Sequence, residues 1–304
     1  MLIFQIKKSV LLPIKEKVSI LEKIIQKLTE ANLEKIFNLK LVSSEFSLHN
    51  FRIDTLAFDP ETKSFVIIEY KKDKSFSVVD QGYAYLSLML NNKADFILEY
   101  NEKLKQNLKR DDVDWSQSKV MFLANFFTPY QRNAINFKDS PIELWEVKVF
   151  ENDTILYNQL IAQDTKESIK TISKVRAASV VEREIKTYTL DYHLERKPNK
   201  IKELLYSLRE RILALNPEVR EVIRKKYIGY RTRKNFVELL PKKKMIKMWL
   251  DIEKNQLQDP RNFGRDMTGI GHWGTGNTEI KFSKIEDLEY ILELIKQSLL
   301  HNQF

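Results

Sequence analysis

The chain has 304 residues, 43% hydrophobic and 31% charged, with a formal net charge of +9, a composition that favours a globular protein of two domains. It contains no cysteine, which excludes disulfide bonds, thiolate zinc sites and cysteine nucleophiles. Its longest uncharged apolar stretch, residues 81–92, is well short of the roughly 20 residues that span a bilayer, so we expect a cytoplasmic protein.

Apolar periodicity and turn residues predict the first elements of the chain. Pro13 is expected to introduce a helix over residues 14–28, where apolar residues recur at helical spacing. A second short helix is expected over residues 31–37, followed by an irregular strand over residues 39–48.

Residues 51–72 are expected to form two strands joined by a turn, and three charged residues in them stand out. Asp54 lies on the first strand, and Glu69 and Lys71 share a face of the second, whose apolar run ends abruptly in charge. Two carboxylates about 4 Å apart repel by roughly 4 kcal/mol at an effective dielectric near 20. A divalent cation would offset this repulsion better than Lys71 alone, so the hairpin predicts a metal site.

The next predicted element is a mostly buried helix over residues 78–91. Gln81 and Tyr85 are four residues apart and therefore share one face of it. A polar pair on a buried helix needs partners, either neighbouring backbone groups or a ligand.

These residues together carry a resemblance to a known family: Asp54, Glu69, Tyr70, Lys71, Gln81 and Tyr85. Their order and spacing resemble the PD-(D/E)XK nuclease superfamily, in particular its RecB-like branch with a Gln-xxx-Tyr element. One departure is that Ile53, and not proline, precedes Asp54. The resemblance implies an α/β fold with a restriction-endonuclease-like mixed sheet flanked by helices.

The resemblance also implies roles for individual residues. Asp54 and Glu69 would hold Mg²⁺ or Mn²⁺, assisted by the backbone carbonyl of Tyr70. Lys71 would orient the attacking water, help to deprotonate it and stabilise developing charge.

Further roles follow for the helices on either side of the hairpin. Gln81 and Tyr85 would hold the nucleic-acid backbone or the water beside Lys71. Related nucleases often place another acidic residue near the metal from the helix before the sheet, which makes Glu34 the candidate and Glu45 a weaker one. A surface glutamate is the alternative for each.

The remainder of the first half alternates between the two element types. Strands are expected over residues 94–100, 120–125 and 142–150, with helices over residues 101–112 and 129–136. This alternation favours an α/β layer architecture. We expect the nuclease-like domain to end at residue 162 and a charged helical linker to occupy residues 163–195.

Residues 196–304 are expected to form a smaller, basic α+β domain. An amphipathic helix is expected over residues 200–215, a second helix over 218–226, three short strands after it, and a final helix over 284–299. Four of the seven glycines of the chain lie between Gly269 and Gly276, in a loop that could present N–H groups to an anion or simply make a tight turn.

Positive charge is concentrated in this domain. Residues 195–248 hold 17 Lys and Arg and 6 Glu, a net +11, which leaves −2 for the remainder of the chain. Most of it lies in three clusters, namely Arg224, Lys225 and Lys226, then Arg231, Arg233 and Lys234, and then Lys242, Lys243 and Lys244. Such a segment suits a polyanionic partner, and we expect it to bind nucleic acid.

These features lead to a functional hypothesis with two alternatives. The chain is expected to be an Mg²⁺-dependent endonuclease-type phosphodiesterase that acts on DNA in restriction, defence or repair. The alternatives are a catalytically silent nucleic-acid-binding or assembly protein on the same fold, and a purely structural salt-bridge cluster. Because one such centre cuts one strand at a time, we expect a homodimer if the substrate is duplex.

Overall fold

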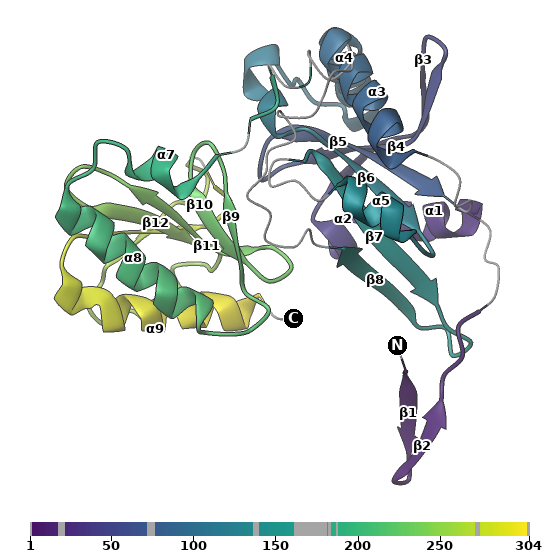
Figure 1. Cartoon of the computed structure of the whole chain (residues 1–304). Helices are drawn as coiled ribbons and strands as arrows, with labels where there is room; N and C mark the ends of the chain where they lie inside the picture. Colours follow the sequence, from purple (N-terminus) through teal and green to yellow (C-terminus); the bar gives the residue numbers. More distant parts are fainter. Residues whose placement is uncertain are drawn as a thin grey trace. The chain divides into compact units, whose positions relative to one another are not determined.

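The computed structural model describes residues 2–17, 22–71, 77–135, 140–160, 181, 184–186, 188–270 and 274–302. They form two compact units, Met1–Lys186 and Thr187–Phe304, each built on a six-stranded sheet (Figure 1). The division falls within the expected linker, of which residues 163–180, 182, 183 and 187 lie outside the described ones. The fold is therefore mixed α/β with a separate, sheet-rich C-terminal unit, as the sequence predicts.

The sheet of the first unit has the strand order β3-β4-β5-β6-β7-β8. Its strands are β3 (Lys40–Leu48), β4 (Phe51–Asp59), β5 (Ser64–Lys71), β6 (Lys119–Ala124), β7 (Ile142–Val149) and β8 (Ile155–Leu160). The central strands β5, β6 and β7 run parallel, and the others pair antiparallel. The carboxyl ends of the three parallel strands therefore meet at one edge. A separate hairpin, β1 (Phe4–Lys7) and β2 (Val10–Pro13), precedes the sheet.

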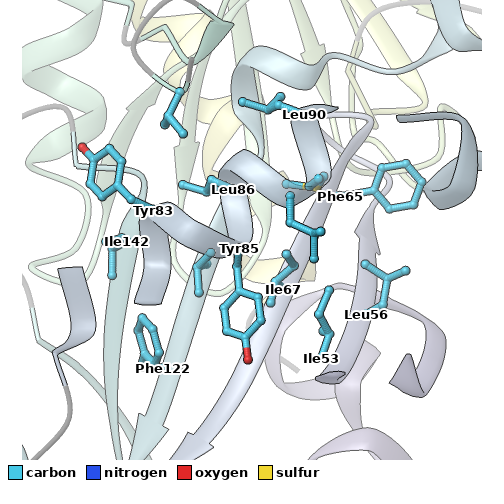
Figure 2. Packing of buried hydrophobic residues seen from close by; sticks show 14 of the residues in the cluster. Ile53, Leu56, Phe65, Ile67, Tyr83, Tyr85, Leu86, Leu90, Phe122 and Ile142 are labelled. Atoms are coloured by element: carbon cyan, nitrogen blue, oxygen red, sulfur yellow. The ribbon is translucent and has the colours of Figure 1, made fainter. Parts of the chain in front are cut away.

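Helices cover both faces of this sheet. On one face α1 (Glu22–Ala31) and α2 (Leu33–Phe37) pack against a cluster that includes Ile68 and Tyr70. On the other, α3 (Val78–Asn91) and α4 (Lys93–Leu104) pack against a cluster that includes Phe65 and Ile67. Figure 2 shows the α3 side chains over the strands of this second cluster. The short α5 (Pro129–Ala134) starts with a capping box at Thr128.

The position of β5 in the sheet explains why its sequence is a nearly continuous apolar run. Seven of its eight residues are buried, because β5 lies between β4 and β6 in the middle of the sheet and helices cover both faces. Helix α3 lies close to the sheet at Gly82, where an added Cβ would come within 2.6 Å of Ile142 Cδ1. Glu69 is the one acidic residue of β5, and it shares the burial of its neighbours.

The second unit has the strand order β13-β14-β12-β11-β10-β9. Its strands are β9 (Arg220–Ile223), β10 (Ile228–Arg231), β11 (Asn235–Pro241), β12 (Ile246–Leu250), β13 (Gly264–Asp266) and β14 (Thr278–Phe282). The helices are α7 (Leu190–Leu194), α8 (Asn199–Leu213) and α9 (Leu288–His301). Figure 1 shows α8 and α9 along one face of this sheet, where their apolar residues complete a second core. All strand pairs here are antiparallel.

Two predictions for the first unit are wrong. Pro13 ends β2 and residues 14–17 are not helical, whereas α1 covers Glu22–Ala31. The segment at residues 94–100, expected as a strand, lies in α4, because Phe96 and Tyr100 are four residues apart and both face the core. A helical crossover from β5 to β6 also satisfies the parallel pairing of those strands.

Two further predictions, for the second unit, are wrong in detail. The expected helix at 218–226 is instead strand β9, whose residues pair with β10 along its whole length, so tertiary pairing overrides local propensity. The last helix begins at Leu288 after a short 3₁₀ turn, and not at residue 284. None of the helices in the described ranges has the length and apolarity needed to cross a membrane.

Candidate functional site

The two predicted acidic residues meet where β4 and β5 lie side by side. The antiparallel register pairs Thr55 with Ile68, so the next residues along, Asp54 and Glu69, lie opposite each other. The Asp54 amide donates to Glu69 Oε1 at 3.2 Å, and the Tyr70 amide donates to Asp54 Oδ2 at 3.0 Å. The carboxylates therefore bond reciprocally to the opposite strand.

Lys71 completes the group at the carboxyl end of β5. Its Nζ lies 3.3 Å from Glu69 Oε2, on the face shared by alternate residues of the strand. The Glu69 side chain is 2% exposed and that of Lys71 is 22% exposed, so the amine borders solvent while the carboxylate is buried. The structure thus brings Asp54, Glu69 and Lys71 together at one edge of the sheet.

The electrostatics of this group show an excess of negative charge. Burial, followed by the charge of Asp54, raises the pKa of Glu69 to about 7, although Lys71 acts in the opposite direction. Burial also raises the pKa of Asp54, opposed by the hydrogen bond from Tyr70. A cation between the two carboxylates would lower both pKa values.

Gln81 and Tyr85 lie beside the acidic pair, on α3. Gln81 Nε2 donates to Tyr85 Oη at 3.3 Å, and the Tyr85 hydroxyl donates to the carbonyl oxygen of Arg52 at 3.2 Å. Burial and the charge of Glu69 raise the pKa of Tyr85. Figure 2 shows Tyr85 reaching from α3 toward the strands. The pair therefore fastens the helix to β4 next to the site.

On β3, the structure places Glu45 next to the acidic pair Asp54 and Glu69. The β3–β4 register brings Glu45 opposite Asp54, and its negative charge raises the pKa of Asp54. Lys23 Nζ lies 2.6 Å from Glu45 Oε1, and Arg52 forms an ion pair with Oε2. The sequence names Glu45 only as the weaker candidate, and the strand register is what favours it over Glu34. The ion pairs of Lys23 and Arg52 with Glu45 were not predicted from sequence.

Glu34, the stronger sequence candidate, is not brought to Asp54 and Glu69. It is exposed on α2, a helix that packs through Leu33 onto the sheet face that also buries Tyr70. Throughout the described part of the chain, no three His, Cys, Asp or Glu residues are grouped so that they could hold a metal ion.

Without Glu34, the candidate ligands are Asp54, Glu69 and the carbonyl of Tyr70, and these oxygen ligands still suit a hard divalent cation. The Tyr70 side chain is buried on the opposite face, where Thr55 Oγ1 donates to its hydroxyl at 3.4 Å, so the side chain is not a ligand and only the main-chain carbonyl of Tyr70 remains a candidate. Two carboxylates and one carbonyl form an all-oxygen set, and Mg²⁺ is commonly held by one or two carboxylates and several waters. These residues therefore fit Mg²⁺ or Mn²⁺ with few protein ligands.

A cavity of about 220 Å³ lies near this edge of the sheet but is distinct from the acidic pair. Lys71 contributes to its wall, together with Tyr70, Leu123 and Asn125, whereas Asp54 and Glu69 do not. We therefore place the candidate site at the carboxylates and not in the cavity.

The three basic clusters of the second unit are separated by its topology. Arg224, Lys225 and Lys226 lie in the β9–β10 turn, and Lys242, Lys243 and Lys244 in the β11–β12 turn. Because successive strands of a meander alternate in direction, these two turns share one end of the sheet. Arg231, Arg233 and Lys234 lie in or beside the β10–β11 turn at the opposite end, where Lys234 pairs with Asp251 at 2.7 Å. The interleaved aromatic residues Tyr227, Tyr230, Phe236 and Trp249 are buried.

The glycine-rich loop binds an anion of its own chain. The Thr275 amide lies 3.1 Å from both carboxylate oxygens of Glu238, and Asn235 Nδ2 adds a bond at 3.2 Å. Gly274 has φ +108°, and a Cβ there would lie 2.3 Å from Glu238 Oε2. This favours the tight-turn interpretation of the loop over phosphate binding.

A substitution at Gly274 tests this interpretation. Gly274→Ala should destabilise the second unit by about 2 to 4 kcal/mol, because it combines backbone strain with loss of bonds to buried Glu238. Gly269→Ala is the control for a positive φ without a steric contact, since its φ is +73° and no atom lies within 4 Å of its Cβ position, although the φ of +108° at Gly274 is the more strained one for alanine. Thermal unfolding should show a clearly larger loss for Gly274→Ala, and equal losses would contradict this role of Glu238.

Comparisons with known proteins identify the domain type of the C-terminal unit and the family of the whole chain. The C-terminal unit is matched over residues 190–299 by the model described as "Domain of unknown function (DUF5655)". The whole chain is 46% identical over 300 residues to an uncharacterised protein of Haemophilus influenzae, covering 98% of this chain and 99% of that one. The chain belongs to the family of that protein.

A search of solved structures gives a distant similarity. A repair endonuclease from Pyrococcus abyssi aligns with a TM-score of 0.25 and 14% identity, over 43% of this chain and 49% of that one. A similarity of this size supports no inference about activity, and the functional argument therefore depends on the site itself.

Proposed function

We propose that the chain is a divalent-metal-dependent nuclease of the PD-(D/E)XK type that hydrolyses phosphodiester bonds in DNA. The observation that carries the proposal is the meeting of Asp54, Glu69 and Lys71 at one sheet edge, with the pKa of Glu69 raised to about 7 by burial and by Asp54. A buried pair of carboxylates with excess negative charge destabilises the fold unless a cation offsets it.

Each residue has a defined part in this proposal. Asp54, Glu69 and the carbonyl of Tyr70 would hold Mg²⁺ or Mn²⁺, which when bound polarises the phosphate and lowers the pKa of water. Lys71, with its amine at the solvent border, positions the attacking water and stabilises negative charge on the phosphate. Gln81 and Tyr85 keep α3 against β4 beside the acidic pair, where they would hold the nucleic-acid backbone or the water next to Lys71.

Metal binding can be tested without reference to cleavage. Mn²⁺ at about 100 times its dissociation constant should stabilise the protein by about 2.7 kcal/mol and raise its melting temperature. Asp54→Asn should lose both this response and plasmid cleavage while keeping the far-UV circular dichroism spectrum of the parent. An unchanged response together with normal cleavage in the variant would reject the site.

The second candidate function is a catalytically silent nucleic-acid-binding or assembly protein on this fold. The observation that favours it is the lack, within the described residues, of a third acidic ligand beside Asp54 and Glu69. A parent protein that is stabilised by Mn²⁺ and binds DNA, yet cuts neither plasmid nor single strands, would support this function over the nuclease.

A further inference from the structure

Two turns at one end of the second unit carry six cationic side chains in matching geometry. Residues 224–227 (RKKY) join β9 to β10, and residues 242–245 (KKKM) join β11 to β12. In each turn the amide of the first residue donates to the carbonyl oxygen of the fourth, at 2.9 Å and 2.8 Å. The two turns therefore project three cations each from tight, hydrogen-bonded hairpins.

Their separation follows from the sheet. Neighbouring strands lie about 4.8 Å apart, and the centres of these turns are two strand spacings apart, or about 10 Å. This distance lies between the widths of the minor and major grooves of B-DNA, roughly 6 and 12 Å. Each of the two turns can therefore contact the phosphates on one side of a groove, so that together they span it.

Four of the six cations of these two turns are available to a partner. Lys225, Lys242, Lys243 and Lys244 are exposed, and none of them forms an ion pair within the described residues. Glu238 is the sole acidic residue between positions 222 and 250, and it is buried and bonded to Thr275.

We propose that residues 224–227 and 242–245 form a docking surface for the phosphate backbone of duplex nucleic acid. The class of partner rests on the nuclease function proposed above. Tyr227 is buried and Met245 is half-buried, so the turns present no exposed apolar side chain for insertion into a bilayer. The cluster that includes Arg231, Arg233 and Lys234 lies at the opposite end and is not part of this surface.

The test compares two full-length triple variants that remove the same charge from opposite ends of the sheet. One is Lys242→Gln/Lys243→Gln/Lys244→Gln, and the control is Arg231→Gln/Arg233→Gln/Lys234→Gln. Binding to a fluorescein-labelled DNA duplex is followed by anisotropy in EDTA, over a range of salt concentrations. Unchanged melting temperatures verify that both variants fold, and Lys225→Gln alone serves as a milder variant of the other turn.

The surface variant should bind about 10- to 100-fold more weakly near physiological salt, with a slope of log K against log salt smaller by about 2 to 3. The control should bind like the parent protein. Equal losses in both variants, or loss of binding to phosphatidylserine vesicles with duplex binding intact, would overturn the surface. Plasmid cleavage with Mg²⁺ is scored separately, so a chain that binds through these turns but never cuts would reject only the nuclease.

Discussion

Replacement of Lys71 by methionine should lower metal-dependent plasmid cleavage by at least 100- to 1,000-fold, because the site loses the cation that we propose lies beside the scissile phosphate. The side chain of Lys71 is 22% exposed, but its removal leaves buried Glu69 without this cation, so the far-UV circular dichroism spectrum and the melting temperature of the variant are measured first, with saturating Mg²⁺. Initial rates on supercoiled plasmid, measured with saturating Mg²⁺, give the size of the effect.

Lys119→Met is the matched control for this variant. Lys119 is also a half-buried lysine of the same sheet, with 20% side-chain exposure, and pairs with Glu143 at 2.7 Å. It begins β6, at the amino end of the parallel strands and therefore away from the carboxylates. The control should retain normal cleavage. Comparable losses in the two variants would mean that Lys71 contributes to stability and not to catalysis.

Glu69→Gln should abolish cleavage and yet make the metal-free protein more stable at about pH 8. The folded pKa of Glu69 is about 7 and the ordinary value is 4.5, so the folded state binds more protons than the unfolded state between these two values. The parent protein therefore loses stability as the pH rises through that window. The loss is at most about 3 kcal/mol, and the neutral glutamine avoids it.

The melting temperature of the variant should exceed that of the parent by about 5 to 10 °C at pH 8 in EDTA, and the difference should vanish near pH 4. Glu146→Gln is the control, since Glu146 is buried on β7 but pairs with Arg132 at 2.6 Å, and its removal should destabilise the protein. A Glu69→Gln protein that melts below the parent at pH 8 would contradict the excess of negative charge at the site.

The acidic hairpin was predictable from sequence because its signal is local. A two-residue alternation places Glu69 and Lys71 on one face, and the short turn between the strands brings Asp54 opposite Glu69. The amphipathic pattern of α8 is equally local, and the structure buries Ile201, Leu204, Leu205, Leu208 and Ile212 along one side of it. Predictions of this kind require only that neighbouring elements pair.

The errors arise where partners distant in sequence decide the outcome. The sequence of the α4 segment predicts a strand, but the parallel pairing of β5 with β6 requires a crossover, which α4 supplies. The sequence of β9 predicts a helix, but its pairing with β10 makes it a strand. Glu45 could not be favoured over Glu34 from sequence, since only the register of β3 against β4 brings it opposite Asp54. The division of the basic clusters between two ends of a sheet likewise requires the strand order.

The reciprocal bonds between β4 and β5 have a consequence for how the site can be observed. The strand ladder stops at the pair Thr55 and Ile68, and beyond it the backbone amides of Asp54 and Tyr70 are bonded by carboxylates of the site itself. Protonation of either acid weakens a bond that protects a backbone amide from solvent. Hydrogen exchange at these two amides therefore reports the ionisation of the site directly, without substrate and without turnover.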